Sequence, residues 1–309
     1  MAAHADVDAL PPGAAVEPAA YDAIVYTVGN SHHHVPTVRQ ALRCPGVVWF
    51  HDARLPGLGE EVGADLVRAA RAVVVNSRAA EGMLRAGRGP EDLPPLLRLE
   101  HAVPDPPAGG PAGRAANPPL VATFGVVHPL KAPGRLMEAV ARIVPAARLA
   151  IVGSLEHVHR EELEARAGSL GIADRVEIHG RVDEKRWWEL MREAKVAVQL
   201  RRATHGEASG AIASAQAVGT PVVTNIAAAE EEYPADAVLA IDADLRPGAL
   251  ERALTRLLED GAESERYSAG ALRHARRCTF PHVAGRLVEF LEDPGGYTRA
   301  SAGPARAAG

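Results

Sequence analysis

The sequence predicts an α/β protein with two doubly wound parallel-sheet domains. From Tyr21 onward, short β-rich runs alternate with longer amphipathic segments, the pattern of parallel strands joined by crossover helices. Residues 104–119 are dense in proline and glycine and can form neither regular element, so we expect a linker there. A chain of 309 residues is long enough to bury two cores.

The first domain is expected over residues 21–103. Its strand candidates are continuous apolar runs, typical of strands buried on both faces. These strands are expected at 23–28, 46–50, 72–76 and 96–100, with helices at 35–43, 60–70 and 78–86.

The second domain is expected over residues 120–293. Its last helix candidate, 247–259, carries an apolar stripe of Leu250, Leu254, Leu257 and Leu258 that would face a sheet. Strands are expected at 120–125, 148–153, 175–179, 195–200, 221–225 and 237–241, and further helices at 133–144, 156–170 and 184–194. We expect residues 1–20 to be a flexible leader and residues 294–309 a flexible tail.

Composition and motifs exclude several classes of protein. The formal charge of −5, without a dense basic cluster, argues against nucleic-acid binding. The distant cysteines Cys44 and Cys278 predict neither a disulfide scaffold nor a zinc site. There is no apolar run long enough to span a bilayer and no signal peptide, so we expect a cytoplasmic protein. The motifs of serine hydrolases, P-loop NTPases, zincins and simple dinucleotide oxidoreductases are missing.

In parallel sheets, ligands bind beyond the carboxyl ends of the strands, so the loops there are the candidate sites. The most informative loop lies within residues 201–225. Ser209 is a candidate N-cap for a helix of small residues, and the amides at such a helix start, near Gly210, would suit a diphosphate. Glu207 could then accept hydrogen bonds from ligand hydroxyls. The alternative is an ordinary strand-to-helix corner with a solvated glutamate.

The loop after the first strand of the second domain contains Gly125 and Lys131. Glycine permits close approach of a ligand to the backbone, and a lysine near a helix start could supply charge to a phosphate. A lone lysine is more often solvated surface, so this interpretation depends on the neighbouring loops.

Two strand ends of the first domain carry polar residues. His51 and Asp52 follow one strand, where a histidine can bind a hydroxyl, transfer a proton or be purely structural. Asn30 and Ser31 follow another strand and precede three consecutive histidines. Adjacent side chains point in different directions, so no metal site is predicted, and this loop is interpreted as polar and acceptor-facing.

These loops and the segments around them resemble the retaining GT-B glycosyltransferases of the family 4 type. The resemblance runs in the family's order from about residue 21 to 290 and rests on the segments YDAIVYTVGNSHHH, PGVVWFHDARL, ATFGVVHPLKAPGRLMEAV, ARLAIVGS, RVEIHGRVDEKRWWELMREAKVAVQLRRATHGEASG and AVGTPVVTN, then EEEYP. It implies two Rossmann-like domains facing across a cleft, the second holding a nucleotide-activated sugar and the first, shortened here, shaping the acceptor site.

The resemblance also implies roles for single residues. Lys131 would contact the donor diphosphate above Gly125, Glu207 would hold hydroxyls of the transferred sugar, and His51 would approach that sugar from the first domain. The other implied donor residues are Arg181 near the nucleobase, Arg201, Ser209 and Gly210 around the same pocket, and Glu232 in an uncertain role. The residues implied on the acceptor side are Asn30, Ser31 and Asp52.

Three features depart from the family pattern. Ala215 falls where the second glutamate of an E-x7-E element is expected, and Val126 or a neighbour replaces a common arginine. The first domain also lacks the usual upstream strand and glycine-rich loop. These departures leave open a protein that depends on a partner.

The function expected from the resemblance is metal-independent transfer of a sugar, with retention, from a UDP- or GDP-linked donor to a small-molecule or glycan acceptor. No cofactor is expected, and the sequence does not identify a side-chain nucleophile. The alternatives are a non-catalytic GT-B-like subunit that binds a nucleotide sugar, with a protein partner, or an epimerase or phosphorylase on the same fold.

Overall fold

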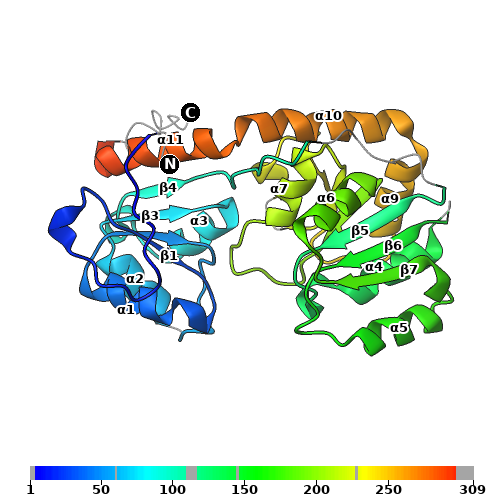
Figure 1. Cartoon of the computed structure of the whole chain (residues 1–309), viewed down its shortest axis with the longest axis horizontal. Helices are drawn as coiled ribbons and strands as arrows, with labels where there is room; N and C mark the ends of the chain where they lie inside the picture. Colours follow the sequence, from blue (N-terminus) through cyan, green and yellow to red (C-terminus); the bar gives the residue numbers. More distant parts are fainter. Residues whose placement is uncertain (1–3, 60, 109–116, 144–145, 227–228, 297–309) are drawn as a thin grey trace. The chain divides into compact units, whose positions relative to one another are not determined.

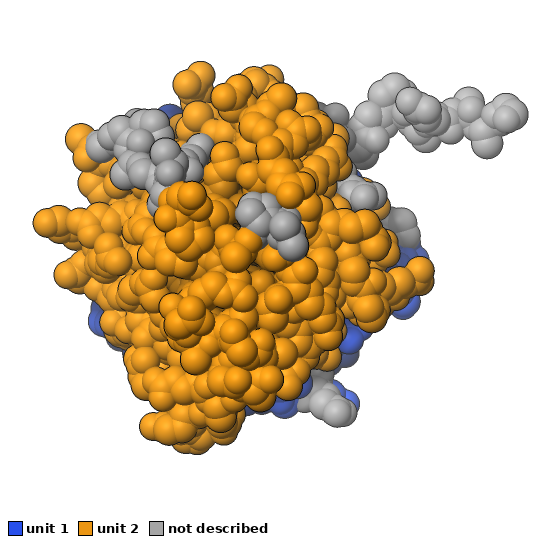
Figure 2. All heavy atoms as spheres, turned by 90° about the vertical axis from the view of Figure 1, so that its right-hand side faces the viewer, with its two compact units in different colours: residues 1–102, 205–208, 280–309 blue, residues 103–204, 209–279 orange. Residues whose placement is uncertain are grey.

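The computed structural model describes residues 4–59, 61–108, 117–143, 146–226 and 229–296. The chain divides into two compact units, coloured separately in Figure 2. Unit 1 comprises Met1–Ala102, His205–Ala208 and Phe280–Gly309, and unit 2 comprises Val103–Thr204 and Ser209–Thr279.

Unit 1 contains a four-stranded parallel sheet in the order β1-β2-β3-β4. The strands are the apolar runs expected from the sequence, with Val25 level with Val47 and Val47 level with Ala72. The bounds are β1 Val25–Val28, β2 Val47–Phe50, β3 Ala72–Val75 and β4 Leu96–Arg98, with helices α1 Val35–Arg43, α2 Val62–Ala69 and α3 Arg78–Arg85 between them.

The two faces of this sheet are covered from different parts of the chain (Figure 1). On one face, Val48, Phe50 and Val73 pack with apolar residues of α1, α2 and α3. On the other, Val74 and Leu97 pack with Val283, Leu287 and Phe290 of the C-terminal helix α11, Phe280–Glu292. Since strand order follows chain order, the crossovers run in one direction and cover one face; the second layer comes from α11.

Unit 2 contains a six-stranded parallel sheet in the order β10-β9-β8-β5-β6-β7. Starting from β5, the chain winds outward through β6 and β7, returns to β8 on the other side of β5, and continues through β9 and β10. This is the order of a doubly wound dinucleotide-binding sheet. The strands are β5 Leu120–Phe124, β6 Arg148–Val152, β7 Val176–Gly180, β8 Val196–Gln199, β9 Val222–Thr224 and β10 Leu239–Ala240.

Helices cover both faces of the second sheet. One core joins it to α4, α5, α9 and α10 and includes Leu136, Leu163, Leu254 and Tyr267, while the other joins it to α6 and α7 and includes Leu190 and Ile212. The helices are α4 Pro133–Arg142, α5 Arg160–Ser169, α6 Glu184–Glu193, α7 Gly210–Ala217, α8 Ala229–Glu232, α9 Ala249–Glu259 and α10 Gly261–Arg277.

The elements follow the sequence expectations closely. Each expected strand is present, with ends within two residues, and α1 has the expected bounds. Helix α5 begins at Arg160 instead of 156, with His159 in extended conformation at its N-cap position. No helix was predicted for residues 261–292, where the structure contains α10 and α11.

The grouping into units differs from the expected domain bounds at Val103, which lies in unit 2, at residues 205–208, which lie in unit 1, and at the C-terminal end. Helix α11 lies in unit 1, whereas the sequence places residues 280–293 in the second domain. The apolar side chains of α11 are needed by the otherwise uncovered face of the first sheet, a demand that local sequence does not reveal. Residues 109–116 of the linker and 297–309 of the tail lie outside the described residues.

In the part of the chain that the structure describes, no helix has the length and apolar character needed to span a bilayer.

Candidate functional site

The winding of the second sheet places two predicted loops side by side. Its direction reverses between β5 and β8, so the loops that follow these neighbouring strands flank the switch point where doubly wound folds bind ligands. The two loops are in direct contact, since the amide of Arg202 donates to the carbonyl of Leu130 across 2.7 Å. The loop with Lys131 and the loop leading to Ser209 therefore form one corner.

The loop after β5 positions Lys131 against Gly125. Gly125 has φ +94°, and a Cβ there would lie 2.9 Å from Lys131 Nζ. A second glycine supports the loop from below: a Cβ on Gly153 would lie 1.8 Å from the Gly125 carbonyl oxygen. The close approach of the ammonium to this strand end therefore requires both glycines.

A turn of 3-10 helix, Pro129–Lys131, presents the lysine. Its cap is His128, whose Nδ1 accepts a hydrogen bond from the amide of Leu130 at 3.1 Å. Ala132, directly after Lys131, adopts a left-handed conformation with φ 49° and starts α4. A non-glycine residue in this conformation costs free energy, so the turn is held by its surroundings.

The loop after β8 is held by Asn225. Its side-chain oxygen accepts from the amide of Arg201 and its side-chain nitrogen donates to the carbonyl of Arg201, both at 2.7 Å. Further along, Ser209 caps α7 as predicted: its hydroxyl accepts from the amide of Ile212 at 3.3 Å. Gly210, the first residue of α7, is exposed, so the positive end of this helix is accessible beside it.

Glu207 belongs to unit 1, unlike Ser209 two residues later. One of its carboxylate oxygens accepts from the amide of His205 at 2.8 Å. The carbonyl of His205 in turn accepts from the amide of Ala53, 2.7 Å away, and the carbonyl of Gly206 accepts from the hydroxyl of Ser77, also 2.7 Å away. The sequence analysis did not foresee this attachment, since it depends on contacts between residues more than 120 positions apart.

Of the residues predicted to lie on the acceptor side, the structure brings Asn30 and Asp52 together. The amide of Asn30 donates to Asp52 Oδ2 at 2.7 Å, and the Asn30 side-chain oxygen accepts from the amide of Gly57 at 2.7 Å. Both side chains thus hold neighbouring loops in place. Ser31 donates its amide to the carbonyl of Gly29 and precedes the 3-10 turn formed by the three histidines.

His51 follows β2, and its amide donates to the carbonyl of Val28 at 2.7 Å. The residue is exposed, yet the protein around it withdraws enough water to lower the pKa of its imidazole, while the carboxylate of Asp52 acts in the opposite direction. A lowered pKa favours the neutral ring, which can both donate and accept hydrogen bonds.

Two predicted donor residues lie at the margins of unit 2. Arg181 follows the edge strand β7; its side chain is 83% exposed and lies 3.9 Å from the carboxylate of Glu156. Glu232 ends α8. Burial raises the pKa of the Tyr233 phenol, the negative charge of Glu232 raises it further, and the positive charge of Arg201 lowers it, so Glu232 and Arg201 both affect this partly buried tyrosine.

A histidine pair that was not predicted from the sequence lies beside Lys131. The rings of His128 and His157 meet edge to face, with centroids 4.6 Å apart. Partial burial lowers the pKa of His128, and the neighbouring charges of His157 and Lys131 lower it further. These histidines follow β5 and β6, adjacent strands, so their position after strand ends was the signal available in the sequence.

The orientation of α7 determines where the side chain of residue 215, the position of the missing glutamate, points. Ala215 is fully buried against the second sheet with Ala122 and Val222, so a side chain at this position points into the core. The absence of a carboxylate at Ala215 therefore removes no group from the corner formed by Lys131 and Ser209. Among the described residues, no group of three or more His, Cys, Asp or Glu side chains is placed to hold a metal ion.

Two parallel α/β units on one chain, the second wound as a dinucleotide-binding sheet with a cationic corner at its switch point, define the class of GT-B glycosyltransferases. The solved structures most informative here share this fold. HepE of Anabaena, in complex with UDP and glucose, has a TM-score of 0.68 at 18% identity, over 84% of this chain and 75% of that one. Sucrose-phosphate synthase of Thermosynechococcus elongatus has a TM-score of 0.69 at 18% identity, over 90% of this chain and 74% of that one.

The chain belongs to the glycosyl transferases group 1 family, whose profile matches residues 111–274. A D-inositol 3-phosphate glycosyltransferase of Xylanimonas cellulosilytica is 30% identical over 277 residues, which cover 84% of this chain and 64% of the relative. The protein of the same name from Thermomonospora curvata is 34% identical over 182 residues, which cover 55% of this chain and 42% of the relative. The chain therefore spans less than two thirds of the length of these relatives. The expectation of a GT-B glycosyltransferase is confirmed.

Proposed function

We propose that this protein transfers a sugar from a nucleotide-sugar donor to a hydroxyl group of an acceptor, as a retaining, metal-independent enzyme of the family 4 type. The observation that carries the proposal is the corner at the switch point of unit 2. There, the Lys131 ammonium lies against Gly125, and the loop that leads to Ser209 and α7 is hydrogen-bonded to the same turn.

The chemistry of the corner suits departure of a nucleoside diphosphate. Cleavage of the sugar–phosphate bond develops negative charge on the terminal phosphate, and catalysis requires groups that stabilise this charge more in the transition state than in the ground state. Lys131 supplies a full positive charge and the amino end of α7 a partial one. On this proposal, these two elements replace the metal ion that other transferases use.

The proposal also gives roles to two residues of unit 1. We propose that Glu207, held by the amide of His205, accepts hydrogen bonds from the sugar hydroxyls, and that His51 contacts the sugar as a neutral ring. Retention follows if the acceptor hydroxyl attacks from the face that the phosphate leaves, and the departing phosphate takes its proton.

UDP-glucose is the donor to test first, since UDP and UDP-glucose are present in the HepE structures. Binding is measured by calorimetry, and turnover by release of UDP in the presence of a mixture of hydroxyl acceptors. Lys131→Ala should lower kcat by about 100-fold or more, as expected for loss of a charge that stabilises the transition state. Lys185→Ala is the matched control, because Lys185 is an exposed lysine on α6.

Three results would contradict parts of the proposal. Unchanged kcat in Lys131→Ala would exclude the diphosphate role of this residue. Loss of turnover in EDTA, restored by a divalent cation, would exclude metal independence. An inverted anomeric configuration of the product, determined by NMR, would exclude retention. Binding of UDP-glucose without turnover under all conditions would instead favour a non-catalytic subunit.

A further inference from the structure

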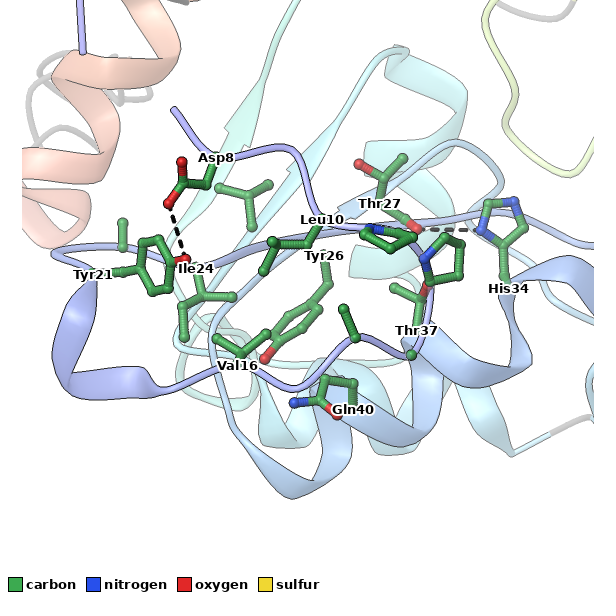
Figure 3. A pocket seen from close by; sticks show the side chains of 16 residues that line it. Asp8, Leu10, Val16, Tyr21, Ile24, Tyr26, Thr27, His34, Thr37 and Gln40 are labelled. Carbon is green, nitrogen blue, oxygen red and sulfur yellow. Dashed lines mark hydrogen bonds between the residues drawn. The ribbon is translucent and has the colours of Figure 1, made fainter. Parts of the chain in front are cut away.

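Unit 1 contains a cavity that none of the predicted site residues lines. It has a volume of about 330 Å³ and lies between residues 8–16, the outer edge of β1 and the helix α1 (Figure 3). Pockets that bind small molecules begin at about this size. The sequence analysis expected residues 1–20 to be a flexible leader; in the structure, residues 8–16 form one wall of this cavity.

The body of the cavity is apolar. Leu10, Val16, Ile24 and Tyr26 surround it (Figure 3). The phenol of Tyr26 donates to the carbonyl of Cys44 at 2.8 Å, which holds the aromatic ring in position. A fixed aromatic face beside aliphatic side chains suits a ring or a short chain of a ligand.

Hydrogen-bonding groups lie at the two ends of the cavity (Figure 3). At one end, the phenol of Tyr21 donates to the carboxylate of Asp8 at 3.0 Å. At the other, His34 Nδ1 lies 3.2 Å from the carbonyl of Thr27. This second end is at the carboxyl end of β1, where the chain continues into Asn30 and Ser31, the predicted acceptor loop.

The edge of β1 adds polar backbone groups to the lining. The ladder to β2 uses the carbonyls of Ile24 and Val28, so the main chain of Val25 and Thr27 faces away from β2. Residues 8–16 cover this edge with two prolines, which have no amide to donate. Within the described part of the chain, β1 pairs with β2 alone, so its outer groups can bind hydroxyls of a ligand.

The charge of the lining restricts the ligand. None of the sixteen lining residues is lysine or arginine, and Asp8 is the one carboxylate among them. A phosphate in this cavity would lose its hydration without a cationic partner, which is costly. The curated relatives are named for D-inositol 3-phosphate, which carries a phosphate, so the cavity does not suit that compound.

We propose that this cavity binds an uncharged acceptor, an alcohol or glycoside with an apolar ring or short chain, whose hydroxyl-bearing end lies toward His34. The assignment of this ligand as acceptor rests on the proposed function. The binding itself rests on the cavity alone, through its apolar body, its polar ends and its lack of cationic side chains.

Phenyl β-D-glucopyranoside is the neutral probe, and glucose 6-phosphate is the charged one. Binding of each to the full chain is measured by saturation-transfer NMR and calorimetry. Thr37→Trp places an indole in the cavity from α1 and should weaken binding of the phenyl glucoside at least tenfold. Val16→Trp should do the same from the opposite wall. Arg39→Trp, on an exposed position of α1 outside the lining, is the matched control and should leave binding unchanged.

Circular dichroism and binding of UDP-glucose establish that each variant is folded. Three results would each overturn the cavity proposal: failure of the phenyl glucoside to bind the wild type, binding in both filled variants as tight as in the wild type, or binding of glucose 6-phosphate that the filled variants abolish. If filling the cavity blocks the phenyl glucoside but no nucleotide sugar binds or reacts, the cavity assignment stands and the proposed function fails. If UDP-glucose is turned over but the filled variants bind the phenyl glucoside as tightly as the wild type does, the proposed function stands and the cavity assignment fails.

Discussion

The hydroxyl of Ser77 donates to the carbonyl of Gly206, 2.7 Å away, and accepts from the amide of Ala80 at 2.9 Å. One side chain therefore caps α3 and secures the loop that carries Glu207, although the two segments are 129 residues apart in sequence. If Glu207 holds the donor sugar, the precision of its placement depends on a serine in a different part of the sequence.

Ser77→Ala tests this link. Loss of the cap costs about 1 kcal/mol, and leaving the buried Gly206 carbonyl without its donor costs about 1–3 kcal/mol more. We expect the free energy of unfolding, measured in urea, to fall by about 2 kcal/mol or more. Ser169→Ala, which removes an exposed hydroxyl bonded to Arg166, should change it by less than about 0.5 kcal/mol. Equal effects of the two changes would contradict this account.

Gly206→Ala should be more damaging than a typical glycine replacement. Gly206 has φ +92°, and a Cβ there would lie 2.9 Å from the Cα of Ala80 and 3.1 Å from the Cβ of Ala53. We expect a loss of stability above about 1 kcal/mol, together with reduced turnover, because the loop must move. Gly82→Ala provides the contrast: it lies within α3 with nothing near its Cβ position, so stability should rise by about 0.5–1 kcal/mol.

The left-handed conformation of Ala132, directly after Lys131, predicts that replacing this alanine by glycine lowers stability less than usual. Both Ala132 and Ala139 are buried, but only Ala132 is left-handed, which costs an alanine about 1–2 kcal/mol. Ala132→Gly should therefore cost at least about 1 kcal/mol less than Ala139→Gly, in the interior of α4. Chemical denaturation of the two variants measures this difference, and equal losses would show that the turn is not strained.

The histidine pair predicts that donor binding depends on pH. Burial, His157 and Lys131 lower the pKa of His128, so without ligand the folded protein binds fewer protons below pH 6.5 than the unfolded chain does. Stability should therefore fall as the pH decreases below about 6.5. A diphosphate beside Lys131 would raise the pKa of His128 again, so binding should be accompanied by proton uptake.

UDP-glucose is the suitable ligand for this measurement, because its diphosphate diester keeps the same charge between pH 7.5 and 5.5. Its affinity should increase roughly threefold or more over this range in the wild type. In His128→Asn the increase in affinity should be smaller. The number of protons taken up on binding should also be lower, as measured by calorimetry in buffers of different ionisation enthalpy. An unchanged pH profile in the variant would remove His128 from the donor site.

Local sequence patterns were sufficient for the elements and for one end of the candidate site. The apolar runs and helical stripes defined strands and helices because their periodicity reports which side of an element is buried, and Ser209 was identified as an N-cap because capping is a local interaction. The positions of Gly125 and Lys131 after a strand end were likewise readable without coordinates.

Contacts between distant segments required the tertiary structure. The packing of α11 against Val74 and Leu97, the hydrogen bond from Ser77 to Gly206, and the meeting of His128 with His157 each join residues that no local pattern relates. The sequence by itself determined an α/β chain of the group 1 glycosyltransferases and predicted a site at its strand ends. Only the tertiary structure decided which strand ends meet and which segment encloses the cavity beside β1, because burial and hydrogen bonding are satisfied by the folded chain as a whole.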